Sequence, residues 1–286
     1  MMKRMIAAGC LVAQMFISSA TAGEMQSQGN PGRSYQTMEG MPLPGSVQVT
    51  GTLKGFIHTP DGKPLVSGDV YFFNEAMGPF PAPEKYWRVA DELGPLDATG
   101  GFSVDLPPGR YYIGAIQRKV DATLIGPPAE GDVFYAGTAK YEVLPGSVNN
   151  VNILKGAKPF SLNTIAKGAG VTAIEGSVVD NAGKPVENAI IFAHKLSTMN
   201  DRPLFVSDRT DKGGAFRIRV ADSGTYYLRV RDLYGGGMPA EGSFMGAYGG
   251  KTPKGIIIKQ GEVIKGIQLT GEKFLRTTPK TKDLKK

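Results

Sequence analysis

Short runs in which apolar and polar residues alternate recur along the chain, and turns containing glycine or proline separate them. The run FSVDL at 102–106 places Phe, Val and Leu at every second position, and FRIRV at 216–220 repeats this alternation. Because alternate side chains of a β-strand lie on one face, both runs predict strands with one buried face. Short strands separated by frequent turn signals favour an all-β sandwich.

Two halves of the chain repeat the same motifs in the same order. The motif GKP at 62–64 recurs at 183–185, and DATGGF at 97–102 recurs as DKGGAF at 211–216. Glycine accepts a positive φ and proline restricts the entry into the next strand, so GKP predicts a hairpin turn in each half. A repeat of this length predicts tandem homologous domains.

The repeats divide the chain into six segments. They are a signal peptide (1–22), a flexible leader (23–46), a first β-sandwich domain (47–154), a linker (155–170), a second β-sandwich domain (171–272) and a basic tail (273–286). The predicted fold class is therefore all-β, with two tandem antiparallel β-sandwich domains. Inside the first domain, PEKYWRVADEL at 83–93 predicts a short helix, with proline near its start and Gly94-Pro95 at its end.

The motifs also resemble a known family. The order G-x-V-x-D-x-x-G-K-P-V-x-x-A, then D-x-x-G-x-F, then L-P-x-G-x-Y is similar to the carboxypeptidase regulatory-like domain. This resemblance covers about 49–154 and 171–272 and implies a transthyretin-like (prealbumin-like) β-sandwich in each half. The first copy departs from the pattern, because it lacks an aspartate equivalent to Asp180 and has Gly68 in place of alanine. Motifs made of turn and core residues specify a fold better than an activity.

The first residues predict export. Lys3 and Arg4 precede the apolar segment 5–19, and ATA at 20–22 presents small residues to a signal peptidase. We expect cleavage near Ala22/Gly23, no transmembrane span in the mature chain, and a periplasmic or secreted protein of the bacterial cell envelope. The only cysteine, Cys10, lies in this segment. Lipidation of that cysteine is a second interpretation.

Charge and composition exclude several classes of function. Without Lys3 and Arg4 the chain keeps 31 basic and 26 acidic residues, and the segment 271–286 alone holds six basic and two acidic ones. The remainder is nearly neutral, so we predict no nucleic-acid partner. A mature chain without cysteine has no disulfide and no cysteine-ligated zinc.

Candidate catalytic residues are scarce. His58 and His194 belong to no metal-binding spacing and predict plain surface roles, so we expect no metal and no cofactor. The signatures Y-R-G-S, Y-x-x-H-x-H and G-x-S-x-G are absent. The acidic pairs Asp91/Glu92 and Asp208/Asp211 lie beside predicted turns, where such residues usually cap backbone amides. We therefore predict that the protein is not an enzyme.

Aromatic residues supply the candidate binding sites. The candidates are Phe80, Tyr86, Trp87 and Arg88 in an insertion at 78–93, Tyr112 and Tyr227 on outer sheet faces, and Phe134, Tyr135, Phe244 and Tyr248 in loops. The irregular stretch that contains this insertion, 74–95, is longer than its counterpart at 195–210. The aromatic composition of the insertion is typical of interaction hot spots. In a second interpretation these side chains pack under their own loops, with Trp87 buried beneath a lid.

These observations favour an exported, non-catalytic binding or structural module of the cell envelope. It would engage an envelope protein or a polysaccharide through its loops. The alternative is an accessory or enzymatic protein that acts on a small metabolite or glycan in a groove between the domains.

Overall fold

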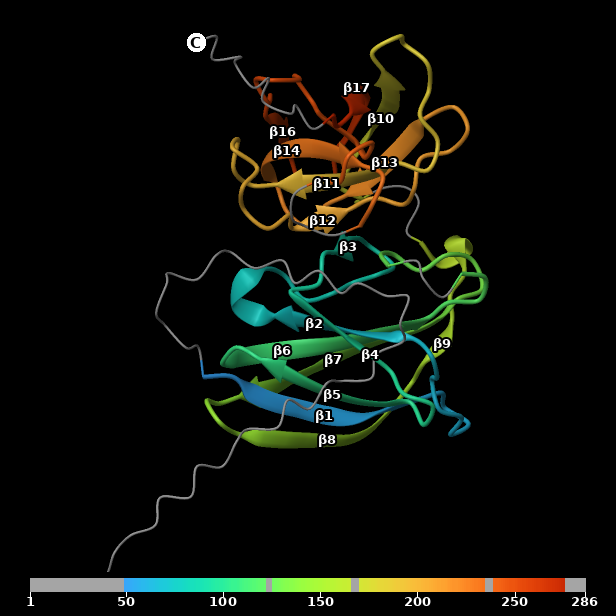
Figure 1. Ribbon diagram of the computed structural model, residues 1–286, viewed down its shortest axis with the longest axis vertical. Coiled ribbons are helices and arrows are strands. Elements are labelled where there is room, and N and C mark those ends of the chain that lie inside the picture. The colour runs from blue at the N-terminus through green and yellow to red at the C-terminus, as the bar shows by residue number, and fades with distance from the viewer. Residues whose placement is uncertain (1–48, 122–124, 166–169, 235–238, 276–286) are drawn as a thin grey trace, which may run out of the picture. The chain divides into compact units, whose positions relative to one another are not determined.

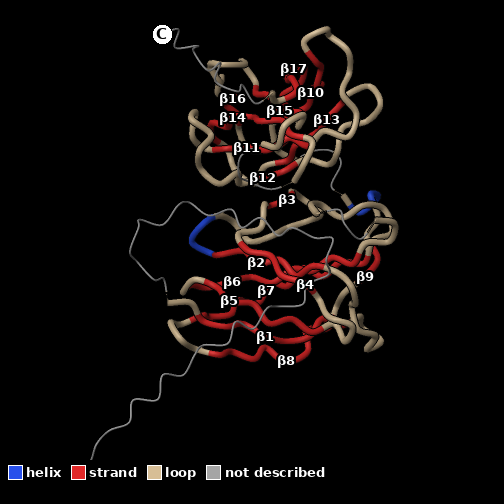
Figure 2. The backbone as a smooth tube through the Cα atoms, viewed as in Figure 1, coloured by secondary structure: helices blue, strands red, loops and turns tan. Residues whose placement is uncertain are grey.

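A computed structural model describes residues 49–121, 125–165, 170–234 and 239–275. The predicted signal peptide with Cys10, the predicted leader and most of the predicted basic tail lie outside the described residues. Strands dominate the described chain (Figures 1 and 2), and its helical elements are the two 3₁₀ turns η1 (Glu75–Met77) and η2 (Leu162–Thr164). The predicted all-β fold class is confirmed.

The first sandwich has two sheets that face each other across an apolar core. One sheet has the order β5 (Gly101–Leu106), β1 (Gly51–His58), β8 (Val148–Lys155). The other has the order β4 (Glu92–Pro95), β2 (Asp69–Asn74), β6 (Gly109–Gln117), β7 (Val133–Val143), β9 (Lys158–Pro159). Phe102 and Tyr111, which alternation predicts to face inward, are both buried in this core.

The second sandwich repeats most of these strand pairs, but its strands are joined in one hydrogen-bonded path. Its strands are β10 (Ala173–Asp180), β11 (Ile190–His194), β12 (Phe205–Val206), β13 (Ala215–Arg219), β14 (Gly224–Arg231), β15 (Phe244–Ala247), β16 (Ile256–Ile258) and β17 (Val263–Lys273). They follow the path β13-β10-β17-β15-β14-β11-β12, and β16 pairs with β14. Phe216 and Tyr226, the counterparts of Phe102 and Tyr111, are buried in its core.

The strand registers show the repeat at the level of single residues. Gly55 lies opposite Phe102, and Gly176 lies opposite Phe216. A Cβ atom at Gly176 would lie 1.7 Å from the carbonyl oxygen of Ile267, so only glycine fits there. One strand pair in each sandwich, β1 with β8 and β10 with β17, is parallel. Each pair has a register shift, between Lys54 and Phe56 in the first sandwich and between Ile174 and Gly176 in the second. Alternation reports which face of a strand is buried but not the direction of its neighbour, so it does not predict these parallel pairs.

The predicted GKP turns are confirmed. The amide of Thr59 donates to the carbonyl oxygen of Lys63 at 2.8 Å, and the amide of Asp180 donates to that of Lys184 at 2.9 Å. The glycines of both turns have positive φ, +87° at Gly62 and +79° at Gly183.

The predicted helix at 83–93 is wrong. The chain makes a single turn in which the amide of Tyr86 donates to the carbonyl oxygen of Ala82, and it then enters β3 (Trp87–Arg88) and β4. β3 pairs with β12 of the second sandwich, and β4 pairs with β2. Pairing with existing sheet edges satisfies the backbone groups that a helix would otherwise have paired internally.

Candidate functional site

The insertion of the first sandwich supplies a strand to the sheet of the second. β3 is the last strand on the path of the second sheet, with Trp87 opposite Val206 and Arg88 opposite Phe205. The amide of Val89 extends this pairing by donating to the carbonyl oxygen of Leu204 at 3.0 Å. The insertion therefore belongs to both sandwiches.

A third apolar cluster lies where the insertion meets the two sheets. We call it the junction cluster; its buried members are Tyr71, Phe73, Trp87, Val89, Ala90, Ile116, Phe134, Phe160, Ile190, Phe192 and Val206. Phe160, in the predicted linker, lies with its ring centroid 5.7 Å from that of Trp87 and 5.5 Å from that of Phe134. Packed aromatic rings at these distances make the junction similar to a protein core.

A buried ion pair fixes the insertion above the junction cluster. The guanidinium of Arg88, whose side chain is 1% exposed, donates to the Asp91 carboxylate at 2.7 Å and to the carbonyl oxygens of Asn74 and Pro79, each at 2.6 Å. Burial lowers the pKa of Arg88, and Asp91 opposes this effect. Arg202 of the second sandwich donates to the other Asp91 oxygen at 3.0 Å. Asp91 therefore joins the insertion to both sandwiches.

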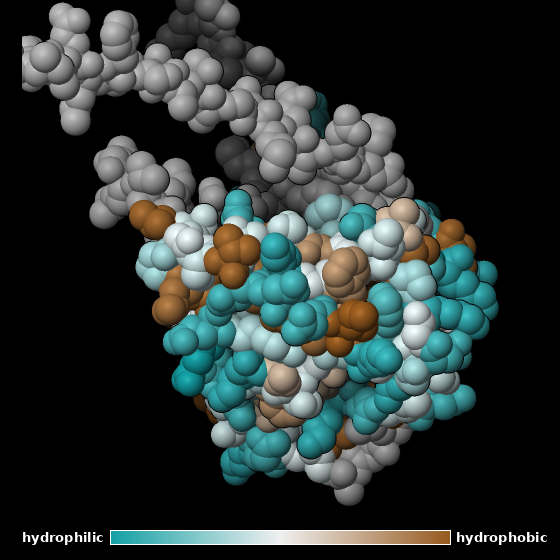
Figure 3. Space-filling view, turned by 90° about the horizontal axis from the view of Figure 1, so that it is seen from below, coloured by the Kyte–Doolittle hydropathy of each residue, from teal (hydrophilic) through white to brown (hydrophobic). Residues whose placement is uncertain are grey.

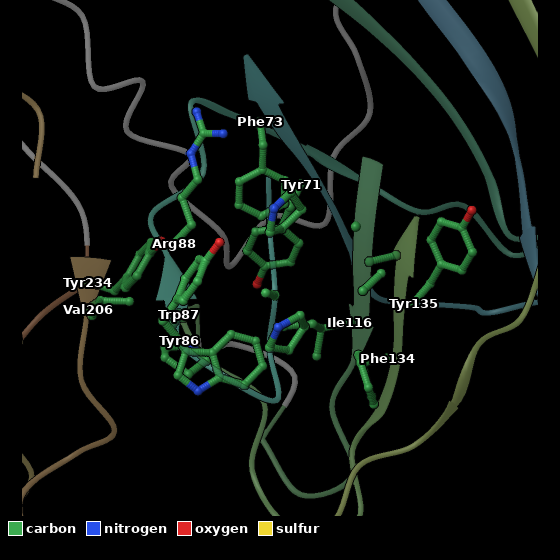
Figure 4. A pocket seen from close by; sticks show the side chains of 18 residues that line it. Tyr71, Phe73, Tyr86, Trp87, Arg88, Ile116, Phe134, Tyr135, Val206 and Tyr234 are labelled. Atoms are coloured by element: carbon green, nitrogen blue, oxygen red, sulfur yellow. The ribbon is translucent and has the colours of Figure 1, made fainter. Parts of the chain in front are cut away.

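An apolar pocket opens beside this network (Figure 4). Its cavity volume is about 40 Å³. Aromatic and small side chains line it: Tyr71, Phe73, Pro81, Ala82, Pro83, Tyr86, Trp87, Arg88, Gly114, Ala115, Ile116, Gly126, Pro127, Phe134, Tyr135, Ala136, Val206 and Tyr234. Gly114 lines the pocket without a side chain. A Cβ atom at this position would lie 3.2 Å from the ring of Phe73, another lining residue.

The pocket offers few free polar groups. Burial raises the pKa of Tyr71 to about 12, and burial together with the charge of Asp222 raises the pKa of Tyr86 to about 12. Both phenols are therefore neutral at physiological pH. The Tyr86 hydroxyl donates to the carbonyl oxygen of Phe80 at 2.8 Å. A ligand in this pocket would meet mainly apolar surface.

Five of the ten candidate residues from the sequence line this pocket: Tyr86, Trp87, Arg88, Phe134 and Tyr135. The side chains of Trp87 and Arg88 are buried, so they are not exposed on a loop where a partner could contact them freely. Phe80 is 44% exposed, and its ring lies 6.3 Å from that of Tyr112.

The other three candidates lie on the second sandwich. Phe244 is buried in its core, and Tyr248 packs against that core. Tyr227 lies on β14 and is partly exposed. The structure therefore does not unite all ten candidates in one site, and their role in binding stays a prediction.

Sequence reasoning missed Tyr71, Phe73 and Tyr234 as pocket residues. A signal was present for the first two, because the run VYFF of β2 is apolar on both faces. Val70 and Phe72 fill the first core, so Tyr71 and Phe73 on the other face need a second partner.

The predicted surface role of His194 is wrong. Its side chain is 4% exposed, and its Nδ1 atom lies 3.1 Å from the Asp201 carboxylate. Neighbouring residues of β11 contribute to the junction cluster, so the outer face of this strand is covered. Burial lowers the pKa of His194.

Two of the predicted acidic caps act on backbone amides. Asp211 accepts from the amides of Gly213 and Ala215 at 2.9 Å each. Asp91 accepts from the amide of Asn74 at 2.7 Å. Within the described ranges, no group of three or more acidic or histidine side chains is placed to hold a metal ion, and no helix is long and apolar enough to cross a membrane.

The face of the first sandwich that is seen from below has no apolar cluster like the one that lines the pocket. That face is largely hydrophilic, with hydrophobic residues scattered across it (Figure 3). Exposed apolar side chains of this sandwich include Phe56 on β1 and Val148 and Ile153 on β8. Single exposed apolar residues are ordinary on protein surfaces, whereas a concave aromatic pocket is typical of a binding site.

No protein-family model matches the chain, and no curated protein matches it. Similar solved structures include the Bacillus anthracis TIE protein, at 16% identity over 79% of this chain and 35% of that chain, with a TM-score of 0.25. GBS52, the minor pilin of Streptococcus agalactiae, has 12% identity over 80% of this chain and 98% of that chain, with a TM-score of 0.25. BcpA, the major pilin subunit of Bacillus cereus, has 9% identity over 78% of this chain and 100% of that chain, with a TM-score of 0.24. This chain thus spans about a third of the TIE chain, and likeness at this level says nothing about function.

Proposed function

We propose that the protein is an exported, non-catalytic binding module of the bacterial cell envelope, and that its pocket receives an apolar side chain of a protein partner. The observation that carries this proposal is the pocket itself, with aromatic walls from β2, β7 and the insertion. Concave apolar sites with few polar groups are typical of ligand binding and of interface anchors.

The chemistry of the pocket favours a protein side chain over a neutral sugar. A sugar ring carries several hydroxyl groups, and burying one without a hydrogen-bond partner costs free energy. The buried guanidinium of Arg88 is already bonded to Asp91 and to backbone carbonyl oxygens. An aliphatic or aromatic side chain would need no such partners.

The alternative of an enzyme acting between the domains has less support. The junction cluster fills the space beside the pocket with buried apolar side chains. The ionisable groups there form a structural ion pair, Arg88 with Asp91, rather than a nucleophile beside a base.

A matched pair of variants tests the proposal. Ala136→Leu adds volume to a residue that lines the pocket, whereas Thr138→Leu adds the same side chain at an exposed position of the same strand. Each tagged protein would be incubated with the native envelope fraction, and co-purifying proteins would be identified by mass spectrometry. We expect wild type and Thr138→Leu to capture the same partner and Ala136→Leu to lose it. Equal capture by all three proteins would contradict the role of the pocket, and a partner that is a glycan alone would contradict the proposal.

A further inference from the structure

The hydroxyl of Tyr71 is a buried polar group at the apolar pocket. The residue is 5% exposed, and its hydroxyl makes no hydrogen bond with any described residue. Tyr71 lines the pocket together with Gly126 (Figure 4). A buried hydroxyl without a partner lowers stability, so a ligand that supplies the missing partner gains affinity from it.

The groups around the phenol oxygen show which partner is missing. Burial raises the pKa of Tyr71, the charge of Arg118 lowers it, that of Asp69 raises it, and the backbone amide of Gly126 lowers it. The guanidinium and the amide are themselves donors, and Asp69 has an interaction of its own. The neutral phenol of Tyr71 therefore lacks an acceptor for its proton.

Two other lining residues have a buried N–H group without a partner, but these groups lie beside residues outside the pocket. The indole of Trp87 acts on the carboxylate of Asp208, and Nε of Arg88 would lie 3.2 Å from a Cβ atom at Gly78. The side chains that line the pocket include no carboxylate and no carboxamide. A ligand N–H group would meet no strong side-chain acceptor there, whereas a ligand carbonyl oxygen would meet Tyr71.

We propose that the group entering the pocket is a prolyl residue of an extended, proline-rich segment of the partner protein, whose carbonyl oxygen accepts from the Tyr71 hydroxyl. This inference rests on the proposed function and names the chemistry of the partner. Proline combines an apolar side chain and a backbone carbonyl with the absence of a backbone N–H group. Its five-membered ring is compact, which suits a cavity of about 40 Å³.

An exposed aromatic pair beside the pocket provides a second contact for such a segment. Phe80 is 44% exposed, and its ring lies 6.3 Å from that of Tyr112. The carbonyl oxygen of Phe80 accepts from the hydroxyl of Tyr86, a lining residue, so the pair adjoins the pocket. Proline-rich segments adopt the preformed polyproline II conformation and dock on surfaces lined by aromatic residues. The pocket and the pair therefore offer contacts to two prolines of one segment.

Fluorescence titration of the full-length protein with three capped peptides tests this proposal. The peptides share serine-glycine flanks and carry a central run of prolines, of alanines, or of alternating leucine and alanine. We expect the proline peptide to bind most tightly and to change the emission of Trp87, which lines the pocket. Tyr71→Phe should weaken this binding about tenfold, because it removes one hydrogen bond from a buried donor, and should leave binding of the leucine peptide unchanged.

Tyr141→Phe is the matched control, because Tyr141 lies on β7 and does not line the pocket. It should bind the proline peptide as wild type does. Tyr71→Phe should keep a thermal midpoint at or above the wild-type value, since the hydroxyl that it removes has no partner in the free protein. A lower midpoint would show that this hydroxyl is already bonded within the chain and would overturn the inference.

The peptide results separate this inference from the proposed function. No binding of the proline peptide, tighter binding of either other peptide, or equal binding of the proline peptide by Tyr71→Phe and wild type would overturn the prolyl residue. If the leucine peptide binds and Ala136→Leu abolishes that binding, the pocket keeps its proposed function and only the prolyl residue is wrong. Peptide binding that Ala136→Leu leaves unchanged would contradict both.

Discussion

The two sandwiches share most of their strand pairs but use the outer face of one sheet differently. The outward residues Tyr71 and Phe73 of β2 correspond to Phe192 and His194 of β11. In the first sandwich, this face and the insertion together line the pocket. In the second sandwich, the sheet pairs with β3 of the insertion at its edge. The candidate site of this repeated fold therefore lies on a segment that differs between the two copies. The apolar core stabilises each sandwich, and the insertion supplies part of the pocket wall.

The largest expected effect tests whether the two cores are equivalent. Phe102→Ala and Phe216→Ala each empty the same position of a repeated core, and each should lower the free energy of unfolding by about 3–5 kcal/mol. Urea unfolding followed by circular dichroism measures this change. A loss in one sandwich only would show that the two cores are packed differently in spite of their shared register.

A second substitution tests the ion-pair network of the insertion, which differs between the two copies of the repeat. Asp91→Ala removes the carboxylate partner of buried Arg88 and also the contact with Arg202. Leaving a buried guanidinium without its carboxylate should cost about 3 kcal/mol. Asp61→Ala is the control, because its ion pair with Lys63 is exposed, and its unfolding midpoint should stay at the wild-type value. If both variants unfold at the wild-type midpoint, the network does not hold the insertion in place.

The smallest expected effect is a change in how stability depends on pH. It concerns His194, which occupies the position in the second sandwich that Phe73 occupies in the first. Burial holds the pKa of His194 below its usual 6.5 in the folded state, and the Asp201 carboxylate only partly opposes this. The unfolded chain therefore binds a proton first as the pH falls, so stability is lost below about pH 6.5 until the folded-state pKa is passed. His194→Gln should show a smaller loss over this range when thermal midpoints are compared at several pH values. An identical pH profile for the two proteins would mean that His194 is not buried in its neutral form.

Local patterns predicted what lies within one strand or one turn. Alternation at 102–106 and 216–220 identified β5 and β13, and glycine with proline identified the two GKP turns. The pairing of β3 with β12 left no such pattern, because a two-residue strand is too short to show periodicity.

The candidate site was predictable in composition but not in geometry. Aromatic enrichment pointed to Tyr86, Trp87 and Arg88, and the structure places them on the pocket. The burial of Trp87 depends on Phe160 and Val206, which are distant in the sequence. Tertiary contacts of this kind have no local signal, apart from the two-sided apolar run of β2.

The insertion joins the two sandwiches through a buried junction. Trp87 is the only tryptophan and is 9% exposed, so its fluorescence reports on the junction alone, whereas far-ultraviolet circular dichroism reports on both sandwiches. Unfolding in urea should be followed by both signals on one sample. We expect a blue-shifted emission that resists quenching by iodide and a fluorescence transition that coincides with the circular dichroism transition. A red-shifted, readily quenched emission in the folded protein, or loss of the tryptophan signal well before the strands unfold, would contradict it.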